Sequence, residues 1–241
     1  MAGLGGIMFV SRSMTRKVIT VGSETPVIEA QELMADNSIR HLPVVDQNQQ
    51  LVGIVTDRDI RSALPYNYLK DTCSEEQRDQ FCALPVKDIM TKDPLAISAT
   101  YTIQDALLMI QNSKVGALPV VDDDRRLEGI ISVRDLLRAF INVLGIGEPG
   151  TLLCILVKEE VGQLKRIVDA ITAEKISFGS VLVARYWEED KRAVFIYLLT
   201  QNVAHVKKKL DNLGFTLLDP MEWYLDQLPA NEASPEKKID D

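Results

Sequence analysis

Apolar residues recur at helical spacing in two stretches of the chain that lie 76 residues apart. One stretch begins at Val27 and the other at Ile103, and in both the apolar positions follow an i, i+3, i+7 pattern. This spacing predicts an amphipathic helix with one face in the core. Thr25 and Pro26 are typical of a helix start, with an N-cap residue followed by proline at the first helical position. The apolar positions are Val27, Ala30 and Met34 in the first stretch and Ile103, Ala106, Leu107 and Ile110 in the second.

Short strand-like runs surround the first predicted helix. Val18–Val21 precedes it and is rich in β-branched residues, and two further apolar runs, Ile39–Val45 and Leu51–Val55, follow it. The polar residues Asp46–Gln50 between the last two runs predict a turn, so these runs should form a hairpin. A second helix is predicted to begin at Thr56–Asp59.

This set of elements occurs twice. Four groups of residues in the first set match four groups in the second at a constant offset of 76 positions. A constant offset indicates two copies of one supersecondary module. The matching groups are Met14-Thr15 and Met90-Thr91, Leu42–Asp46 and Leu118–Asp122, Gly53-Ile54 and Gly129-Ile130, and Arg58-Asp59 and Arg134-Asp135.

A different pattern begins after Gly150. The stretch Gly145–Gly150 contains three glycines and a proline, which is typical of a break between domains. Strand-like and helical spacings then follow in the order βαββαβ, which predicts a ferredoxin-like plait. The predicted strands are Thr151–Val157, Ser180–Trp187, Arg192–Thr200 and Phe215–Leu218, and the predicted helices have apolar positions at Leu164, Ile167, Val168 and Ile171 and at Val203, Val206, Leu210 and Leu213.

Composition and charge argue against several classes of protein. Of the 241 residues, 46% are hydrophobic and 26% are charged, as in average soluble globular proteins. The net charge of −8 opposes a broad grip on nucleic acid, which needs many Lys and Arg side chains. No stretch approaches the roughly 18 apolar residues of a membrane helix. Basic residues follow the apolar segment Gly3–Val10 instead of preceding it, the reverse of a secretory signal. We therefore expect a cytoplasmic protein that binds neither nucleic acid nor membranes.

Reactive residue types are sparse. The three cysteines and two histidines show neither a disulfide framework nor the spacing of a zinc site. The sequence also lacks a nucleophile–base pair, a metal-ligand cluster and a P-loop. We therefore predict no catalytic residue, no metal site and no required cofactor.

The most informative motif lies at the start of the last helix of each copy, as Thr56-x-x-Asp59 and Ser132-x-x-Asp135. One interpretation is a capping box, in which the hydroxyl and the carboxylate satisfy backbone N–H groups and stabilise the helix start by about 1 kcal/mol. A cap alone does not account for the arginine within each motif or for the glycine three residues before it. The alternative is a phosphate site, because free N–H groups and the positive end of the helix dipole attract anions. The arginine would then neutralise phosphate charge.

With their L-P-V-V-D and G-h-h-[ST]-x-R-D motifs, the two copies resemble a tandem pair of CBS domains, also called a Bateman module, over roughly Met8–Leu144. The resemblance implies CBS domains at 8–64 and 86–144, joined by a connecting segment at 65–85. It also implies an adenosyl ligand such as AMP, ADP, ATP or S-adenosylmethionine. The aspartate would bind the ribose, the hydroxyl would lie near the phosphates, and the base would lie in an apolar slot. The ligand-binding residues it implies are Thr20, Val21, His41, Leu42, Pro43, Thr56, Arg58 and Asp59 in the first copy and Ile97, Ala117, Leu118, Pro119, Ser132, Arg134 and Asp135 in the second.

The two sites are not expected to be equivalent. His41 is either a partly buried, hydrogen-bonded residue or a contact to the base or phosphate. The second copy has Ala117 in its place, and Ala96 in place of Thr20, so we expect the first site to bind better. The connecting segment is predicted to be a solvated surface excursion with a short helix around Ser74–Phe81, and a lid over one site is the alternative.

The plait at 150–219 resembles an ACT domain, on the basis of its element order and of Gly162 at the start of its first helix. ACT domains that bind ligands, mostly amino acids, hold them at a dimer interface near this loop. The resemblance therefore implies a possible ligand site at Glu160, Val161 and Gly162. A simple tight turn between strand and helix is the alternative, since the loop lacks the common Pro-Gly pair. A CBS pair followed by an ACT-like domain resembles the acetoin-utilisation AcuB family.

Together these features predict an α+β protein that regulates and does not catalyse. It would sense an adenosyl ligand in the CBS pair and an amino acid or small metabolite at the ACT-like domain, in acetoin or central carbon metabolism. We expect a homodimer and a target protein that the sequence does not identify.

The alternative is a structural or interaction module that regulates a partner without binding a nucleotide. DNA binding ranks below both, since no helix-turn-helix or basic face is recognisable. Residues 229–241 are predicted to form a polar tail.

Overall fold

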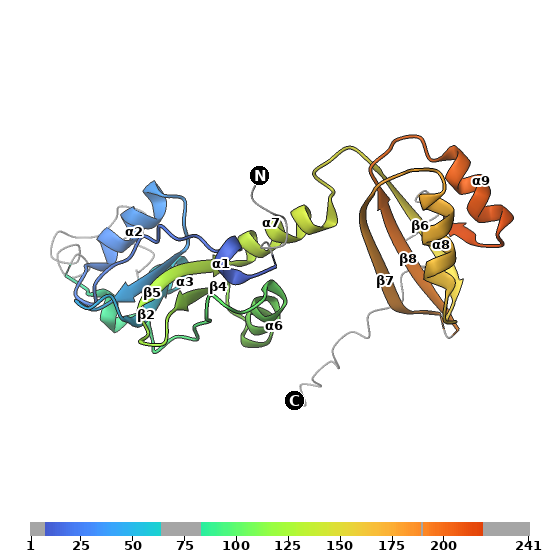
Figure 1. Cartoon of the computed structure of the whole chain (residues 1–241). Helices are drawn as coiled ribbons and strands as arrows, with labels where there is room; N and C mark the ends of the chain where they lie inside the picture. Colours follow the sequence, from blue (N-terminus) through green and yellow to red (C-terminus); the bar gives the residue numbers. More distant parts are fainter. Residues whose placement is uncertain (1–7, 64–82, 189, 219–241) are drawn as a thin grey trace, which may run out of the picture. The chain divides into compact units, whose positions relative to one another are not determined.

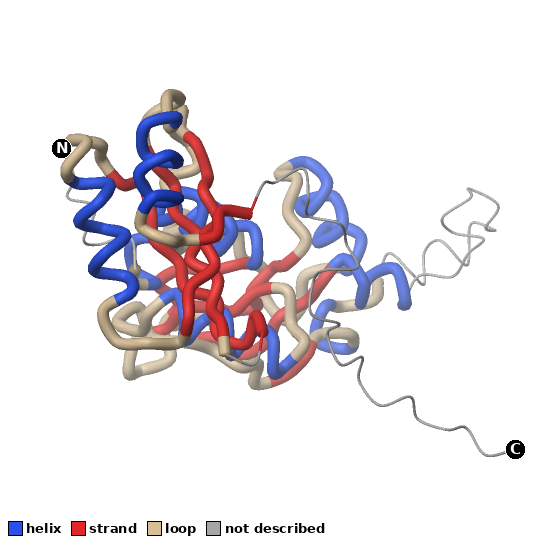
Figure 2. The backbone as a smooth tube through the Cα atoms, turned by 90° about the vertical axis from the view of Figure 1, so that its right-hand side faces the viewer, coloured by secondary structure: helices blue, strands red, loops and turns tan. Residues whose placement is uncertain are grey.

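The computed structural model describes residues 8–63, 83–188 and 190–218, and the chain divides into two compact units, Met1–Ala139 and Phe140–Asp241 (Figure 1). Both units contain strands and helices (Figure 2). Most of the predicted connecting segment, including the helix expected around Ser74–Phe81, lies outside the described residues, and so does the predicted tail at 229–241. In the described part of the chain, no helix is long and apolar enough to cross a membrane.

The first unit contains two similar sets of elements, as the repeat predicts. Each set has a short helical turn, a longer helix, an antiparallel hairpin and a final helix. The hairpins share one register, because His41 pairs with Thr56 and Ala117 pairs with Ser132, and both are irregular at the same place near the end of the first strand. The first set consists of α1 (Val10–Ser13), α2 (Val27–Asp36), β1 (His41–Val45), β2 (Leu51–Thr56) and α3 (Asp57–Ala63), and the second of η2 (Val86–Asp88), β3 (Thr91–Lys92), α6 (Ile103–Ser113), β4 (Ala117–Val121), β5 (Leu127–Ser132) and α7 (Val133–Leu144).

Helical spacing correctly identifies the buried faces of α2 and α6. Each helix buries its residues at i, i+3 and i+7. Leu107, which we expected on the buried face of α6, is 38% exposed instead. The predicted strand Val18–Val21 is reduced to a single parallel bridge between Val21 and Val44.

The start of α2 also differs from the prediction. Pro26, not Thr25, is the N-cap residue, and it has no side-chain acceptor. Thr25 Oγ1 instead accepts a hydrogen bond from the backbone N–H of Gly22 at 3.1 Å. At the equivalent position of α6, Thr102 is the N-cap residue and forms a capping box with Asp105. The two copies therefore begin the same helix by different means.

In each copy, the segment that precedes the longer helix, α2 or α6, pairs with the hairpin of the other copy. The Thr15 N–H donates to Ile130 O at 2.9 Å, and the Ile130 N–H donates to Thr15 O at 3.0 Å. In the same way, Thr91 of β3 pairs with Ile54 of β2. These reciprocal contacts relate the two copies by an approximate two-fold axis, as in an isologous dimer. We call 14–19 and 90–95 the exchanged segments.

The exchanged segments explain why a glycine recurs in each hairpin. A Cβ atom at Gly129 would lie 2.6 Å from Sδ of Met14 and 3.0 Å from the backbone oxygen of Thr15. A Cβ atom at Gly53 would likewise lie too close to the side chain of Met90. In a strand, glycine often marks a close approach of another segment. Here each glycine makes room for the methionine of the opposite copy.

The second unit has the predicted βαββαβ order. Its strands lie in the sheet order β7-β8-β6-β9 and are antiparallel throughout, which is the arrangement of a ferredoxin-like plait. Buried residues of both helices and of the strands form one core cluster. The elements are β6 (Thr151–Lys158), α8 (Gln163–Thr172), β7 (Phe178–Glu188), β8 (Lys191–Leu198), α9 (Ala204–Asn212) and β9 (Thr216–Leu218).

Replacing Gly129 tests the packing of the exchanged segments. Gly129→Ala is expected to lower the free energy of unfolding of the first unit by about 1–3 kcal/mol, as overpacking usually does. Urea unfolding followed by circular dichroism measures the loss. Gly22→Ala is the matched control, because the nearest atom to a Cβ there is 3.8 Å away, and its effect should stay within about 0.5 kcal/mol. Equal losses in the two variants would contradict the packing role of Gly129.

Candidate functional site

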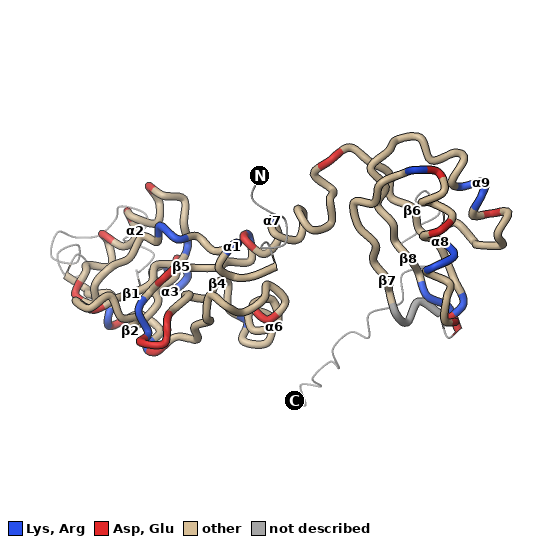
Figure 3. The backbone as a smooth tube through the Cα atoms, in the orientation of Figure 1, with Lys and Arg blue, Asp and Glu red and all other residues tan. Residues whose placement is uncertain are grey.

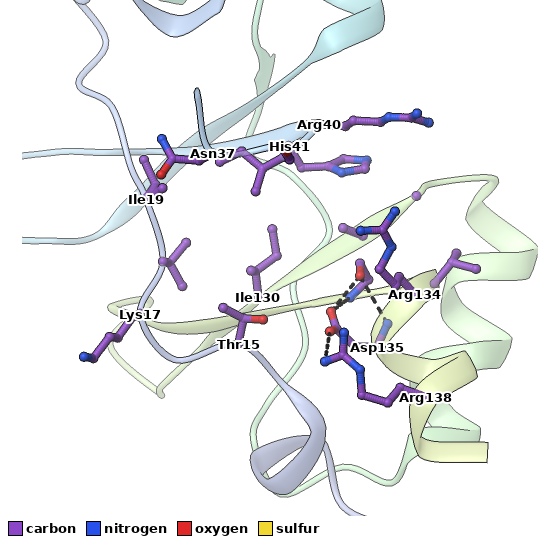
Figure 4. A pocket seen from close by; sticks show the side chains of 17 residues that line it. Thr15, Lys17, Ile19, Asn37, Arg40, His41, Ile130, Arg134, Asp135 and Arg138 are labelled. Atoms are coloured by element: carbon purple, nitrogen blue, oxygen red, sulfur yellow. Dashed lines mark hydrogen bonds and ion pairs between the residues drawn. The ribbon is translucent and has the colours of Figure 1, made fainter. Parts of the chain in front are cut away.

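A cavity of about 510 Å³ lies in the first unit at the start of α7 (Figure 4). Residues within four segments line it: 15–19, 37–41, 116–117 and 130–138. The first two segments belong to the first copy and the last two to the second, so the cavity lies between the copies. Its volume falls within the range of about 300–1,000 Å³ that is typical of small-molecule sites.

The two-fold pairing brings these segments together. The bridge between Thr15 and Ile130 holds the first exchanged segment against β5. The backbone N–H of Val133, the first residue of α7, donates to Gly116 O at 3.1 Å, which holds the helix start beside β4. Gly116 in turn faces His41, since a Cβ atom at Gly116 would lie 2.6 Å from Nε2 of that histidine. Neither copy alone could form this cavity.

Asp135 lies at the centre of one wall and is only 8% exposed; it is the one buried charged residue in the described part of the chain. Its Oδ2 accepts hydrogen bonds from the Ser132 N–H at 2.9 Å and from the Ser132 hydroxyl at 2.6 Å. Its Oδ1 lies 3.6 Å from Nη1 of Arg138. The carboxylate therefore caps the helix with one oxygen, while the other faces an exposed arginine that a ligand could displace.

The capping interpretation of the repeated motif is confirmed in both copies. The Thr56 N–H and hydroxyl donate to Asp59 Oδ2 at 2.8 and 2.7 Å, and the Asp59 N–H donates back to Thr56 Oγ1 at 3.3 Å. Thr102 and Asp105 form a third box of the same kind at α6. Because the capping hydrogen bonds do not involve Arg58 or Arg134, they leave the phosphate-site interpretation open.

The start of α7 offers fewer free donors than an isolated helix would. In its first turn, the Val133 N–H is bound to Gly116 O and the Asp135 N–H is bound to Ser132 Oγ at 3.3 Å. The only proton of the Ser132 hydroxyl is donated to Asp135. Binding of an anion here therefore depends mainly on cationic side chains.

His41 forms part of the opposite wall and is half-buried. Burial lowers the pKa of His41 below its ordinary value of 6.5, the charge of Arg40 lowers it further, and Asp59 and Asp57 oppose the shift. Because its pKa lies below 6.5, the imidazole is mostly neutral at pH 7, with one nitrogen that donates and one that accepts. Such a side chain suits a contact to a base or a hydroxyl better than a contact to a phosphate.

The structure divides the residues predicted for the ligand sites into three groups. Five of them line the cavity: His41, Ala117, Ser132, Arg134 and Asp135. Thr56, Arg58 and Asp59 lie together at the start of α3, apart from this lining. The other seven, most of them with side chains in the core, are Thr20, Val21, Leu42, Pro43, Ile97, Leu118 and Pro119.

Three cationic residues in the lining were not predicted: Lys17, Arg40 and Arg138. Arg138 lies three residues after Asp135 on one helix, so helical spacing could have suggested it. Lys17 and Arg40 belong to the first copy and line this cavity only because the two copies pair. No motif in the sequence carries that information.

The residues predicted for an ACT-type site lie in the loop between β6 and α8. Gly162 is the N-cap residue of α8 and has φ +96°, a left-handed conformation that favours glycine. Val161 is fully exposed. The Glu160 carboxylate accepts a hydrogen bond from Nε2 of Gln163 at 3.0 Å. In a single chain this loop is open to solvent.

Comparison with known proteins places the first unit in a family. A family model of the CBS domain matches residues 10–66 and 86–142. The CBS domain-containing protein DDB_G0289609 from Dictyostelium discoideum is 33% identical over 137 residues, which are 57% of this chain and 94% of that protein.

Solved structures match as well, among them the following two. CBSX2 in complex with AMP, a protein from Arabidopsis thaliana, is 32% identical over 56% of this chain and 96% of its own, with a TM-score of 0.47. The Vibrio cholerae protein described as an acetoin utilization protein (AcuB) is 30% identical over 59% and 98%, with a TM-score of 0.48.

The repeated fold and the cavity between its copies define a tandem pair of CBS domains. The chain belongs to the family of CBS domain-containing proteins. Some relatives are enzymes of which the chain spans only a part, such as 28% of the inosine-5′-monophosphate dehydrogenase of Methanocaldococcus jannaschii. The ACT-like assignment of the second unit stays a prediction.

The pKa of His41 provides a test of the cavity wall. In a proton NMR titration, the His41 signal should have its midpoint below 6.5, because burial disfavours the charged ring. His41→Gln identifies the signal by removing it. Arg40→Gln should move the midpoint upward, since it removes a nearby positive charge.

The lowered pKa of His41 also makes the stability of the folded protein depend on pH. Below about pH 6.5 the unfolded chain binds a proton at His41 before the folded protein does. The free energy of unfolding should therefore fall as the pH drops through 6.5, and it should fall less in His41→Gln. A midpoint above 6.5 would contradict the burial of the imidazole in this wall.

Proposed function

We propose that this protein is a non-enzymatic regulator that binds an adenosyl ligand in the cavity at the start of α7. The observation that carries the proposal is the buried carboxylate of Asp135, which caps the helix with Oδ2 and presents Oδ1 beside Arg138 in a cavity of ligand size. A buried carboxylate with accepting capacity to spare suits the two hydroxyls of a ribose.

The surrounding residues suit the other parts of such a ligand. Arg134 belongs to the repeated motif and lies in the same lining, so it is the proposed partner of the phosphate next to the ribose. Ser132 uses its hydroxyl proton on Asp135, so we assign it the role of holding the carboxylate. The proposed ligands are AMP, ADP, ATP and S-adenosylmethionine, which share the adenosine half.

We propose this cavity as the principal site, which differs from the expectation that the first copy binds better. That expectation rested on His41 and Thr20. The side chain of His41 lies in the wall of the cavity at the second copy's helix start, and Thr20 is not part of the lining. The cluster of Thr56, Arg58 and Asp59 remains a proposed second site. We also propose that the protein acts as a homodimer on a target protein. Regulation without nucleotide binding, through protein contacts alone, is the alternative function.

A thermal-shift panel tests the proposal. At least one of AMP, ADP, ATP, NAD and S-adenosylmethionine should raise the melting temperature of the first unit, since a ligand at 100 times its Kd stabilises by about 2.7 kcal/mol. Asp135→Asn should remove most of the shift, and Asp59→Asn should affect it less.

The third capping box supplies the matched control. Asp105→Asn breaks the same hydrogen-bond pattern at α6, in a helix start that does not line the cavity. It should cost about 1 kcal/mol of stability, as a lost cap does, and should keep the full ligand shift. If no compound shifts the melting temperature, or if Asp135→Asn keeps the full shift, the proposal fails and the interaction-module alternative is favoured.

For the second unit we propose an amino-acid input at Glu160, Val161 and Gly162, completed by a second copy of the chain. The exposure of this loop supports the need for a second wall. In sedimentation velocity, one of the common amino acids should increase the dimer fraction. Val161→Arg should abolish that increase, because a charged side chain at a fully exposed position blocks an interface without disturbing the core. If no amino acid changes the dimer fraction, this input is excluded.

A further inference from the structure

The cavity at the start of α7 collects more positive charge than the repeated motif provides. Besides Arg134 of the motif, Lys17, Arg40 and Arg138 also line it. Against these four permanent cations the lining contains one carboxylate, that of Asp135, which lies 3.6 Å from Arg138. The chain as a whole carries −8, and its acidic and basic residues are interspersed along both units (Figure 3). The local excess of cations is therefore a property of this cavity.

The approximate two-fold axis provides an internal comparison. The positions equivalent to Lys17, Arg40 and Arg138 are Asp93, Gly116 and Ser62. Only the motif arginine is kept, as Arg58. Asp93 lies 2.7 Å from Arg125 in an ion pair. The backbone pairing is the same around both helix starts, so the difference lies in the side chains. Three cations are present on one side of the axis and absent from the equivalent positions on the other.

Three of the four cations, Arg40, Arg134 and Arg138, lie on one side of the cavity, where they can act on a bound anion together, whereas Lys17 extends away from them on the other side (Figure 4). Arg134 extends from the α7 side toward the wall formed by Arg40 and His41, and Arg138 lies beside Asp135 (Figure 4). All four residues are exposed, and the side chain of Arg138 is 66% exposed. Their exposed charged groups stay hydrated, which avoids the cost of burying unpaired charge. A ligand would therefore extend its phosphates toward the three arginines and its ribose toward Asp135.

We infer that the ligand of this cavity is an adenosine di- or triphosphate, and that Arg40 and Arg138 set the preference for a polyphosphate over AMP. This inference rests on the proposed function. One arginine is sufficient for a single phosphate, whereas two further arginines can bind a β- and a γ-phosphate. S-adenosylmethionine has a positive sulfonium and an ammonium group, which this cluster repels.

Isothermal titration calorimetry at low and at high salt tests the inference, with adenosine, AMP, ADP, ATP, S-adenosylmethionine and inorganic tripolyphosphate as probes. In the unaltered protein ATP should bind at least about tenfold more tightly than AMP, and raising the salt should reduce this ratio, because exposed charges are screened. Tripolyphosphate alone should bind more weakly than ATP, since it lacks the ribose that Asp135 is proposed to hold.

Serine variants locate the source of the preference. Arg40→Ser and Arg138→Ser should each weaken ATP binding by about three- to fivefold, the effect of one exposed ion pair, and change AMP binding by less than about twofold. Lys207→Ser is the matched control: it removes one exposed positive charge from α9 in the second unit and should leave both affinities unchanged.

Each outcome decides between the two proposals. Equal binding of AMP and ATP, tighter binding of S-adenosylmethionine, or an unchanged ATP-to-AMP ratio in both arginine variants overturns the polyphosphate preference and leaves adenosyl binding intact. Tripolyphosphate binding as tight as ATP binding, or no binding of any adenosine compound, overturns the proposed function and the preference with it.

Discussion

The fold of the first unit depends on the reciprocal pairing between each exchanged segment and the hairpin of the opposite copy. Thr15 with Ile130, and Thr91 with Ile54, join the two copies through backbone hydrogen bonds. Glycine at positions 53 and 129 makes room for this contact, because a Cβ atom at either position would lie too close to a methionine side chain. The cavity is a direct result, since one exchanged segment forms part of its wall. Stability of the pair and completeness of the site are therefore linked.

Local patterns predicted most elements of the fold. Apolar spacing located α2 and α6 and their buried faces, and the repeat of Leu42–Asp46 located both hairpins. The βαββαβ order of the second unit was also predictable, because each element is marked by its own periodicity. The errors concern features that only tertiary contact decides. The short run Val18–Val21 forms a single β-bridge, through Val21, instead of a strand. Pro26, and not Thr25, is the N-cap residue of α2.

The site was less predictable than the fold. The motif placed Ser132, Arg134 and Asp135 at a helix start, which local sequence is sufficient to do. It could not show that His41 of the first copy faces Gly116 of the second, or that Lys17 and Arg40 join the same lining. Those contacts arise from the two-fold pairing between segments far apart in sequence. The motif also overstated the free N–H groups, because Gly116 O and Ser132 Oγ accept two of them.

The presence of both copies in one chain allows their sites to evolve independently. In a dimer of identical single domains, every substitution appears on both sides of the axis, so the two sites must remain alike. Here Lys17 and Asp93 occupy equivalent positions with opposite charges, while the backbone contacts that relate the copies are retained. Duplication within a chain thus separates the interface, which requires symmetry, from the chemistry of the sites, which does not. One of the two sites can change its ligand, or lose it, while its capping box continues to stabilise the helix.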